Sequence, residues 1–260
     1  MKQKIQKFGG AMFTPVLLFA FAGIMVGLAT TCMNPQIMGD LANPESIWYK
    51  FWAMISAGAN TVFNQLPVLF AVSLPIALAK KQNARACMET FVIYITFNYF
   101  VSEFLNQFGA SLGFDFAAEV GGTSGLAMIA GIKTLDTGMI GAILIAGIAI
   151  YLHNKFYDKE LPDYLGVFKG SAFVVMIGFF VMIPVAILIA LVWPHVQSAL
   201  LGLQGFFKAS GAAGLFTYNL LQKLLLPFGV HHFIYAPVLF DNVIVDGGTI
   251  SYWEIGRAHV

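Results

Sequence analysis

Long apolar runs alternate with short polar connections along this chain. Five such runs precede residue 195, and they cover roughly residues 11–33, 52–79 and 87–105, a glycine-rich run ending near 152, and residues 171–193. Each is long enough for a helix that crosses a hydrocarbon layer of about 30 Å. The runs are apolar on all sides, whereas membrane β-barrel strands alternate in polarity over about ten residues. The pattern therefore predicts an all-α polytopic membrane protein.

The pattern changes after residue 195. Two shorter apolar pieces follow, at residues 212–226 and 233–245, with a polar break at 227–232 between them. A pair of segments too short to span twice, hinged at Pro and Gly, is typical of the broken or re-entrant helices at a transporter's binding site. We therefore expect a five-span scaffold in residues 1–195 and the start of a substrate domain in residues 196–253.

The composition is typical of a membrane protein and limits the classes of binding partner. The chain is 58% hydrophobic and 10% charged, with a mean hydropathy of +0.78. The net charge of +1 leaves no basic face once the Lys and Arg residues are assigned to membrane flanks, so the sequence argues against a nucleic-acid partner. Cys32 and Cys87 have no CxxC spacing and no nearby His, so neither a metal site nor a disulfide is indicated.

The basic residues predict the orientation. Three connections that fall on one side of the membrane hold most of them, at positions 2, 4, 7, 80, 81, 85, 155, 159 and 169. The other side receives only Lys50 and Lys133, in links that also contain acidic residues. Because cytoplasmic connections carry the excess of Lys and Arg, we expect the N-terminus in the cytoplasm. Residues 11–33 show no clear cleavage site, so we interpret them as a retained span.

Two polar stretches lie at or near membrane depth. Asn60, Asn64 and Gln65 precede Pro67 in the second run, and such carboxamides need partners from other helices or from water. Contacts between helices and contacts to a substrate are equally compatible with them. Residues 109–137 are glycine-rich and predict an extracellular or re-entrant connection. They contain no GxxxxGK[ST] pattern, which argues against a nucleotide site.

The break at residues 227–232 carries the candidate chemistry. Pro227 and Gly229 free backbone groups for a ligand, and His231 and His232 add two imidazoles to an apolar run. Neighbouring positions point about 100° apart on a helix, so the two rings do not suit one metal ion. We expect one ring to face the cavity while the other forms hydrogen bonds within the fold.

Lys223 lies eight residues before His231. A continuous helix would separate them by about 12 Å, and a bend at Pro227 would bring them closer. Either Lys223 extends to the membrane interface or it contacts substrate. The candidate substrate-binding residues are therefore Lys223, His231 and His232.

Four motifs carry a resemblance to a known family. They are residues 62–71 (VFNQLPVLFA) followed by 79–81 (AKK), residues 156–158 (FYD) with 161–166 (LPDYLG), residues 227–232 (PFGVHH), and residues 129–137 (IAGIKTLDT). With them, residues 1–253 resemble the membrane component, enzyme IIC, of the bacterial phosphoenolpyruvate-dependent sugar phosphotransferase system. The similarity is to the glucose superfamily, and the last motif resembles its α-glucoside (maltose-type) branch.

The resemblance implies a sugar permease in the inner (cytoplasmic) membrane of a bacterium. Such a permease works as a homodimer in the lipid bilayer and imports an α-glucoside such as maltose while phosphorylating it. The phosphate comes from a phosphocysteine on a separate B domain (IIB), which makes the chain a component of a sugar phosphotransferase with no cofactor or metal. The different-class alternative is a secondary transporter or channel for a polar solute without phosphotransfer, and only the motifs separate the two.

The resemblance also implies roles for individual residues. The first histidine of the family's GxHH motif contacts the sugar and handles the accepting hydroxyl, which makes His231 the catalytic candidate. A basic residue, commonly arginine, stands eight positions earlier, where this chain has Lys223. Because lysine lacks the bidentate fork of arginine, a phosphate-facing role is retained but a planar clamp is not.

Some of the family's parts are not found in this sequence. The family has a second hairpin that carries a glutamate in a GxxEP-type motif, and a B domain that carries a cysteine in a CxTR-like setting. Neither motif is found here, and neither Cys32 nor Cys87 matches the B-domain cysteine. We therefore expect a C-terminally truncated fragment that is inactive alone. Residues 254–260 (EIGRAHV) depart from the family pattern and can be back-translated into a sequencing-library adapter, so we interpret them as a non-native tail.

Overall fold

The computed structural model describes residues 2–112, 115–120 and 124–210, together with the single positions 216, 217, 220 and 223. The hinge at residues 227–232, the C-terminal pieces of the predicted substrate domain and the tail at 254–260 lie outside the described residues. The predicted division into domains therefore stays a prediction. The scaffold residues are described almost completely.

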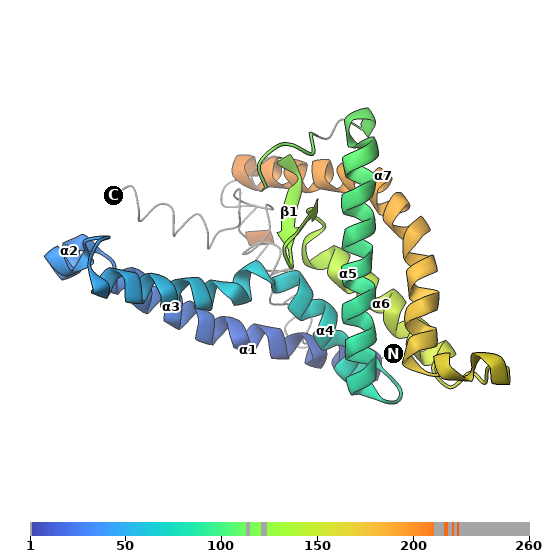
Figure 1. The fold of residues 1–260 in the computed structure, drawn as a ribbon. Helices are drawn as coiled ribbons and strands as arrows, with labels where there is room; N and C mark the ends of the chain where they lie inside the picture. Colours follow the sequence, from blue (N-terminus) through green and yellow to red (C-terminus); the bar gives the residue numbers. More distant parts are fainter. Residues whose placement is uncertain are drawn as a thin grey trace.

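Two long helices form an arm that extends from the rest of the molecule (Figure 1). α1 (Lys2–Cys32) and α3 (Ile47–Asn64) lie side by side, joined by α2 (Pro35–Met38) and the 3-10 helix η1 (Gly39–Ala42). A hydrogen bond joins the two ends of this connection: the indole of Trp48 in α3 donates to the carbonyl of Cys32 in α1 over 2.9 Å.

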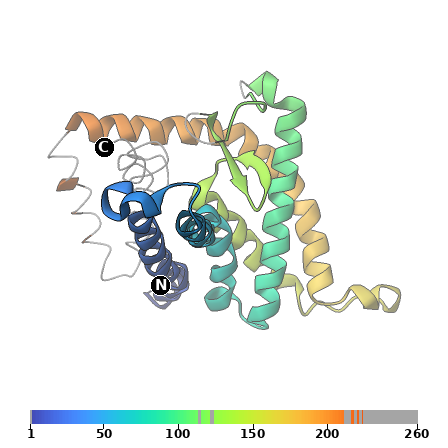
Figure 2. The same cartoon turned by 60° about the vertical axis from the view of Figure 1, so that its left-hand side comes forward.

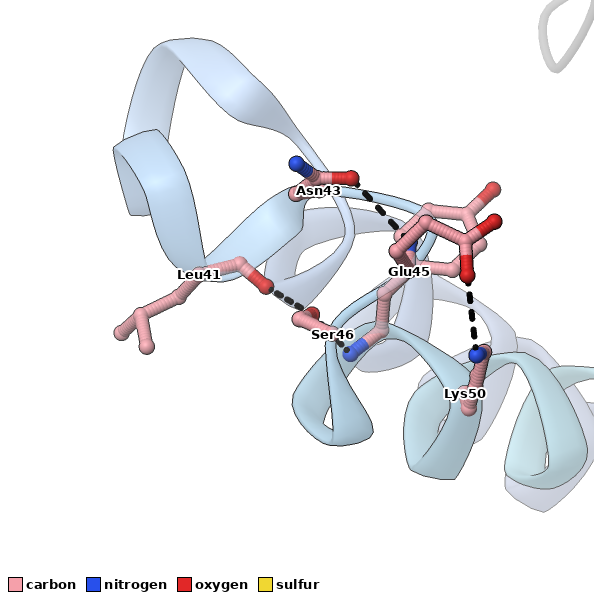
Figure 3. Close-up of polar contacts among 6 residues, drawn as sticks. Leu41, Asn43, Glu45, Ser46 and Lys50 are labelled. Atoms are coloured by element: carbon pink, nitrogen blue, oxygen red, sulfur yellow. Dashed lines mark hydrogen bonds and ion pairs between the residues drawn. The ribbon is translucent and has the colours of Figure 1, made fainter.

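The start of α3 shows why the helix begins where it does. Figure 3 shows the Ser46 hydroxyl at the N-cap, where it accepts from the amide of Tyr49 and donates to the carbonyl of Leu41. A hydroxyl at this position satisfies an amide that has no partner inside the helix. The ion pair of Lys50 with Glu45 beside it spans 3.3 Å and is exposed, so it contributes little to stability.

The second predicted run is not one straight helix. α3 ends at Asn64, α4 (Leu66–Leu78) follows, and the two are bent by 56° at Gln65. Pro67 explains the break, because it has no amide to donate to the carbonyl of Phe63 and its ring would clash with that carbonyl in a continuous helix. The predicted run at residues 52–79 thus falls on two helices joined by a bend, which together are long enough for one span.

The core forms around α5 (Asn83–Phe108), which packs against α4, α6 (Gly138–Phe156) and α7 (Ser171–Ser210) (Figures 1 and 2). Buried side chains recur every three or four positions along α5, at Ala86, Glu89, Ile93, Phe97, Val101 and Leu105. α7 continues past the predicted end at residue 193 and changes direction along its length, with Pro184 and Pro194 inside it.

The glycine-rich connection contains the strands. The 3-10 helix η2 (Gly109–Leu112) follows directly after the last residue of α5. β1 (Leu126–Ile129) then pairs with β2 (Ile132–Leu135) as an antiparallel hairpin. Ala130 and Gly131 form its two-residue turn, with φ of 49° and 81°. Positive φ at both central positions is what a tight hairpin turn requires. The prediction of an all-α chain is therefore right for the bulk of the described residues and misses this hairpin.

Three helical stretches are long and apolar enough to cross a membrane in the described part of the chain: Lys7–Cys32, Gly138–Phe156 and Ser171–Gln197. The bent pair of α3 and α4 would make a fourth. α5 is not among them, since Glu89, Asn98 and Glu103 are interspersed with its apolar residues and lower its hydropathy. Several apolar helices are thus present, while the predicted number of five spans is not confirmed.

Candidate functional site

Only Lys223 of the predicted site is described. It has helical conformation and an exposed side chain. His231 and His232 lie outside the described residues, so nothing here tests whether the three residues meet. The candidate site at the hinge stays a prediction.

A buried pair that the sequence analysis missed joins α5 to α6. Nδ1 of His153 lies 2.6 Å from Oε2 of Glu89, and both side chains are almost fully buried. Nε2 of His153 lies 2.8 Å from the carbonyl oxygen of Lys81. Because a carbonyl only accepts, Nε2 carries a hydrogen, and one further proton is needed between Nδ1 and Oε2. The pair is therefore neutral as a whole while it holds two hydrogen bonds.

Further contacts next to this pair join the connection between α4 and α5 to the C-terminal end of α6. The Tyr157 ring packs against the His153 ring with centroids 4.8 Å apart, and its hydroxyl accepts from Arg85 over 2.9 Å. The ammonium of Lys81 donates to Asp158 over 2.8 Å, and this hydrogen bond and charge raise the pKa of Lys81. The connection between α4 and α5 is thereby fixed to the C-terminal end of α6.

These contacts bring two of the sequence motifs together. Lys81 belongs to the motif at residues 79–81 and Asp158 to the motif at 156–158. Glu89 was the one sign of the buried pair in the sequence, because an acidic residue inside an apolar run needs a buried partner. Its partner lies 64 positions away, and no local pattern identifies it.

The break between α3 and α4 is a second point where distant parts of the chain are in contact. The side-chain oxygen of Gln65 accepts from the backbone amide of Ala130 at the hairpin turn, over 2.9 Å. Figure 1 shows the hairpin reaching the junction of the two helices. Of the carboxamides noted in the sequence, Gln65 thus joins two elements, Asn60 donates weakly to Ser56 over 3.4 Å, and Asn64 is exposed.

The other end of the hairpin is held by α7. The indole of Trp193 donates to the carbonyl of Asp136 over 2.7 Å, and the amide of Gln197 donates to the carbonyls of Asp136 and Gly125. The amide of Gly138 donates to the Asp136 carboxylate over 3.2 Å, while burial raises the pKa of that carboxyl group. The hairpin is therefore fixed both at its turn and at its base.

Comparison with known proteins gives a consistent result. Residues 9–258 match the family described as "Phosphotransferase system, EIIC". The chain is 55% identical over 253 residues to the "PTS system maltose-specific EIICB component" of Bacillus subtilis, and covers 48% of that protein. It is 52% identical to the "PTS system alpha-glucoside-specific EIICB component" of Leptotrichia buccalis and covers 47% of it. It is 48% identical to the "Phosphotransferase IIC component GlvC" of Escherichia coli, of which it covers 69%.

Each of these alignments includes 97% of this chain. The chain spans about half the length of the first two relatives. The family match includes the motifs at residues 62–71, 129–137 and 156–166, whose contacts the structure shows. The chain belongs to the EIIC family of the phosphotransferase system.

Proposed function

We propose that this chain is the sugar-carrying part of a phosphotransferase permease that imports an α-glucoside, with maltose as the expected substrate, and phosphorylates it during uptake. The observation that carries the proposal is the high identity, extending over nearly the whole chain, to proteins named for maltose and α-glucosides. The motif at residues 129–137, which suggested the α-glucoside branch, forms the docked hairpin turn.

The reaction requires groups that accept a proton and stabilise a phosphate. A sugar hydroxyl oxygen forms a bond to phosphorus while the phosphorus–sulfur bond of a phosphocysteine on a B domain breaks. The electron pair leaves on the cysteine thiolate, and the hydroxyl proton passes to His231. Lys223 contributes a positive charge near the phosphate, and His232 helps to orient the sugar. Phosphorylation makes uptake irreversible, because the charged product does not cross back through lipid.

The proposed permease lies in the inner membrane of a bacterium with its N-terminus in the cytoplasm. Its scaffold in residues 1–195 would form the homodimer, and its substrate domain would begin at residue 196. Two contacts support the orientation. The basic connection with Lys81 and Arg85 meets the basic end of α6 at one place, as an assignment of both to the cytoplasmic side requires.

The proposal is tested with the full-length permease and its B domain. We expect α-glucosides to accept phosphate from the phosphorylated B domain, and His231→Ala to abolish the transfer with little loss of protein from the membrane. His195→Ala, which changes an exposed histidine of α7, serves as the matched control and should leave transfer intact. Unaltered transfer in H231A would contradict the assignment of the catalytic residue.

A further inference from the structure

The outward face of α3 changes character along the helix. Ile47, Phe51 and Met54 follow one another on this face and are 87%, 49% and 66% exposed. Their spacing continues to Thr61 and Asn64, which are also exposed. The other face packs against α1, where the rings of Phe63 and Phe19 stack with centroids 6.1 Å apart. One face of the helix is thus apolar in its first half and polar in its second.

The polar half lies deep in the membrane if α3 and α4 cross it together. Asn64 lies about 26 Å along the axis of α3 from Ile47, and the 13 residues of α4 extend about 20 Å beyond the break. With a hydrocarbon layer of about 30 Å, both ends of the pair reach an interface and the break lies inside. The exposed carboxamide of Asn64 is costly against lipid at that depth, while the exposed Thr61 hydroxyl donates to the Ala57 carbonyl over 3.5 Å and keeps its lone pairs for a further partner.

The hairpin turn provides a second, independent observation at the same place. Ala130 and Gly131 are exposed at the turn, and the Ala130 amide is bonded to Gln65 beside the break. Non-helical backbone at membrane depth is tolerated only where protein covers it or where it lines a water-filled cavity. The exposed turn is thus bonded to the residue that follows Asn64, one helical turn from Thr61.

We propose that Thr61, Asn64 and the turn at Ala130–Gly131 line a water-filled vestibule that binds sugar hydroxyl groups on the way to the hinge site. The inference rests on the proposed function and adds a contact site on the scaffold to it. Asn and Thr each donate and accept hydrogen bonds, which suits the hydroxyls of a neutral sugar. Residues 57–65 contain no charged side chain, so this stretch is unsuited to binding an ion or a phosphate.

The test uses the purified full-length permease and measures the Kd for maltose without a phosphate donor and the KM for maltose in phosphate transfer. Asn64→Ala should raise both about fivefold, the effect of one lost neutral hydrogen bond, while the maximal transfer rate stays near that of the wild type. Thr61→Val keeps the side-chain shape, removes only the hydroxyl, and should raise both about two- to fivefold. Met54→Ala changes the apolar half of the same face and should leave both unchanged.

The outcomes separate this inference from the proposed function. If the wild type transfers no phosphate to any α-glucoside, the proposed function fails. If the wild type is active and both N64A and T61V bind maltose as tightly as the wild type does, the proposal of a sugar-binding vestibule is wrong. A lowered thermal stability of N64A with an unchanged Kd would show that Asn64 packs against protein, and it would also overturn the inference. Should N64A not accumulate, the isosteric T61V decides the question alone.

Discussion

Glu89 and His153 form a buried contact, and replacing either residue leaves the other side chain buried without its partner. Both side chains are almost completely buried, and the imidazole bridges the carboxylate and the carbonyl of Lys81. In a low-dielectric interior, a charged group left without its partner is far less stable than the intact pair. The pair therefore holds the ends of α5 and α6 together only as a unit.

Removing the imidazole should be much more harmful than neutralising the carboxylate. We expect His153→Ala to lower the free energy of unfolding by about 3–5 kcal/mol, because a buried carboxylate loses its partner. Glu89→Gln should cost about 1 kcal/mol, because an amide still forms a hydrogen bond to the ring. Denaturant unfolding of the purified full-length protein in detergent measures both changes.

The double variant completes this experiment. Replacing both Glu89 and His153 by Ala should cost less than the sum of the two single Ala variants, because no uncompensated charge remains. Lys81→Ala is the matched control, since it keeps the backbone carbonyl that His153 contacts and removes only an exposed ammonium with its ion pair to Asp158, which contributes little to stability. Additive losses in the double variant would show that the two groups do not act as a pair.

At the scale of elements, the hairpin and the broken helix depend on each other. The hairpin turn provides the amide that Gln65 accepts, and α7 binds the base of the hairpin through Trp193. The turn itself requires φ of 49° at Ala130 and 81° at Gly131. A side chain is strained in this conformation, and glycine is not.

Two substitutions at the turn should therefore differ in their effect on stability. Gly131→Ala should destabilise the protein by about 1 kcal/mol, because it places a Cβ atom in the left-handed region. Ala130→Gly should be neutral or slightly stabilising, because it relieves the same strain at the neighbouring position. Thermal unfolding of the two full-length variants compares them directly, and equal effects of both would argue against this turn geometry.

Sequence reasoning located the helices better than it located their interruptions. The run at 171–193 lies within α7, and the run at 11–33 lies within α1 except for its last residue, because an unbroken apolar stretch of that length has few alternatives. The break at Gln65 was not predicted, although Pro67 was noted, since a proline is also compatible with the first turn of a helix. The strands of the hairpin have only four residues each, too few for a pattern to identify.

Single residues of a candidate site are easier to predict from sequence than the pairs that helix packing brings together. Single residues such as His231 are conspicuous because a polar group in an apolar run is costly. Pairs such as Glu89 with His153, or Gln65 with Ala130, join positions 64 and 65 residues apart and depend on how the helices pack. Packing of this kind has no signal in a local stretch of sequence.

For the molecule as a whole, two contacts connect motifs that are distant along the chain. Gln65 and Ala130 join the motifs at residues 62–71 and 129–137, and Lys81 and Asp158 join those at 79–81 and 156–158. The first contact lies at the helix break and the second at the end of α6. The motifs at residues 62–71, 79–81, 129–137 and 156–158 thus also contribute contacts that connect the scaffold's elements.

The chemical form of the imported sugar tests the central claim most directly. Membrane vesicles that contain the full-length permease and its B domain, loaded with phosphoenolpyruvate and the phosphate-transfer proteins, are given labelled maltose from outside. The proposal predicts that the label inside is recovered as maltose phosphate and that no free maltose accumulates there. Accumulation of unmodified maltose inside these vesicles would contradict group translocation and would make the protein a transporter without phosphotransfer.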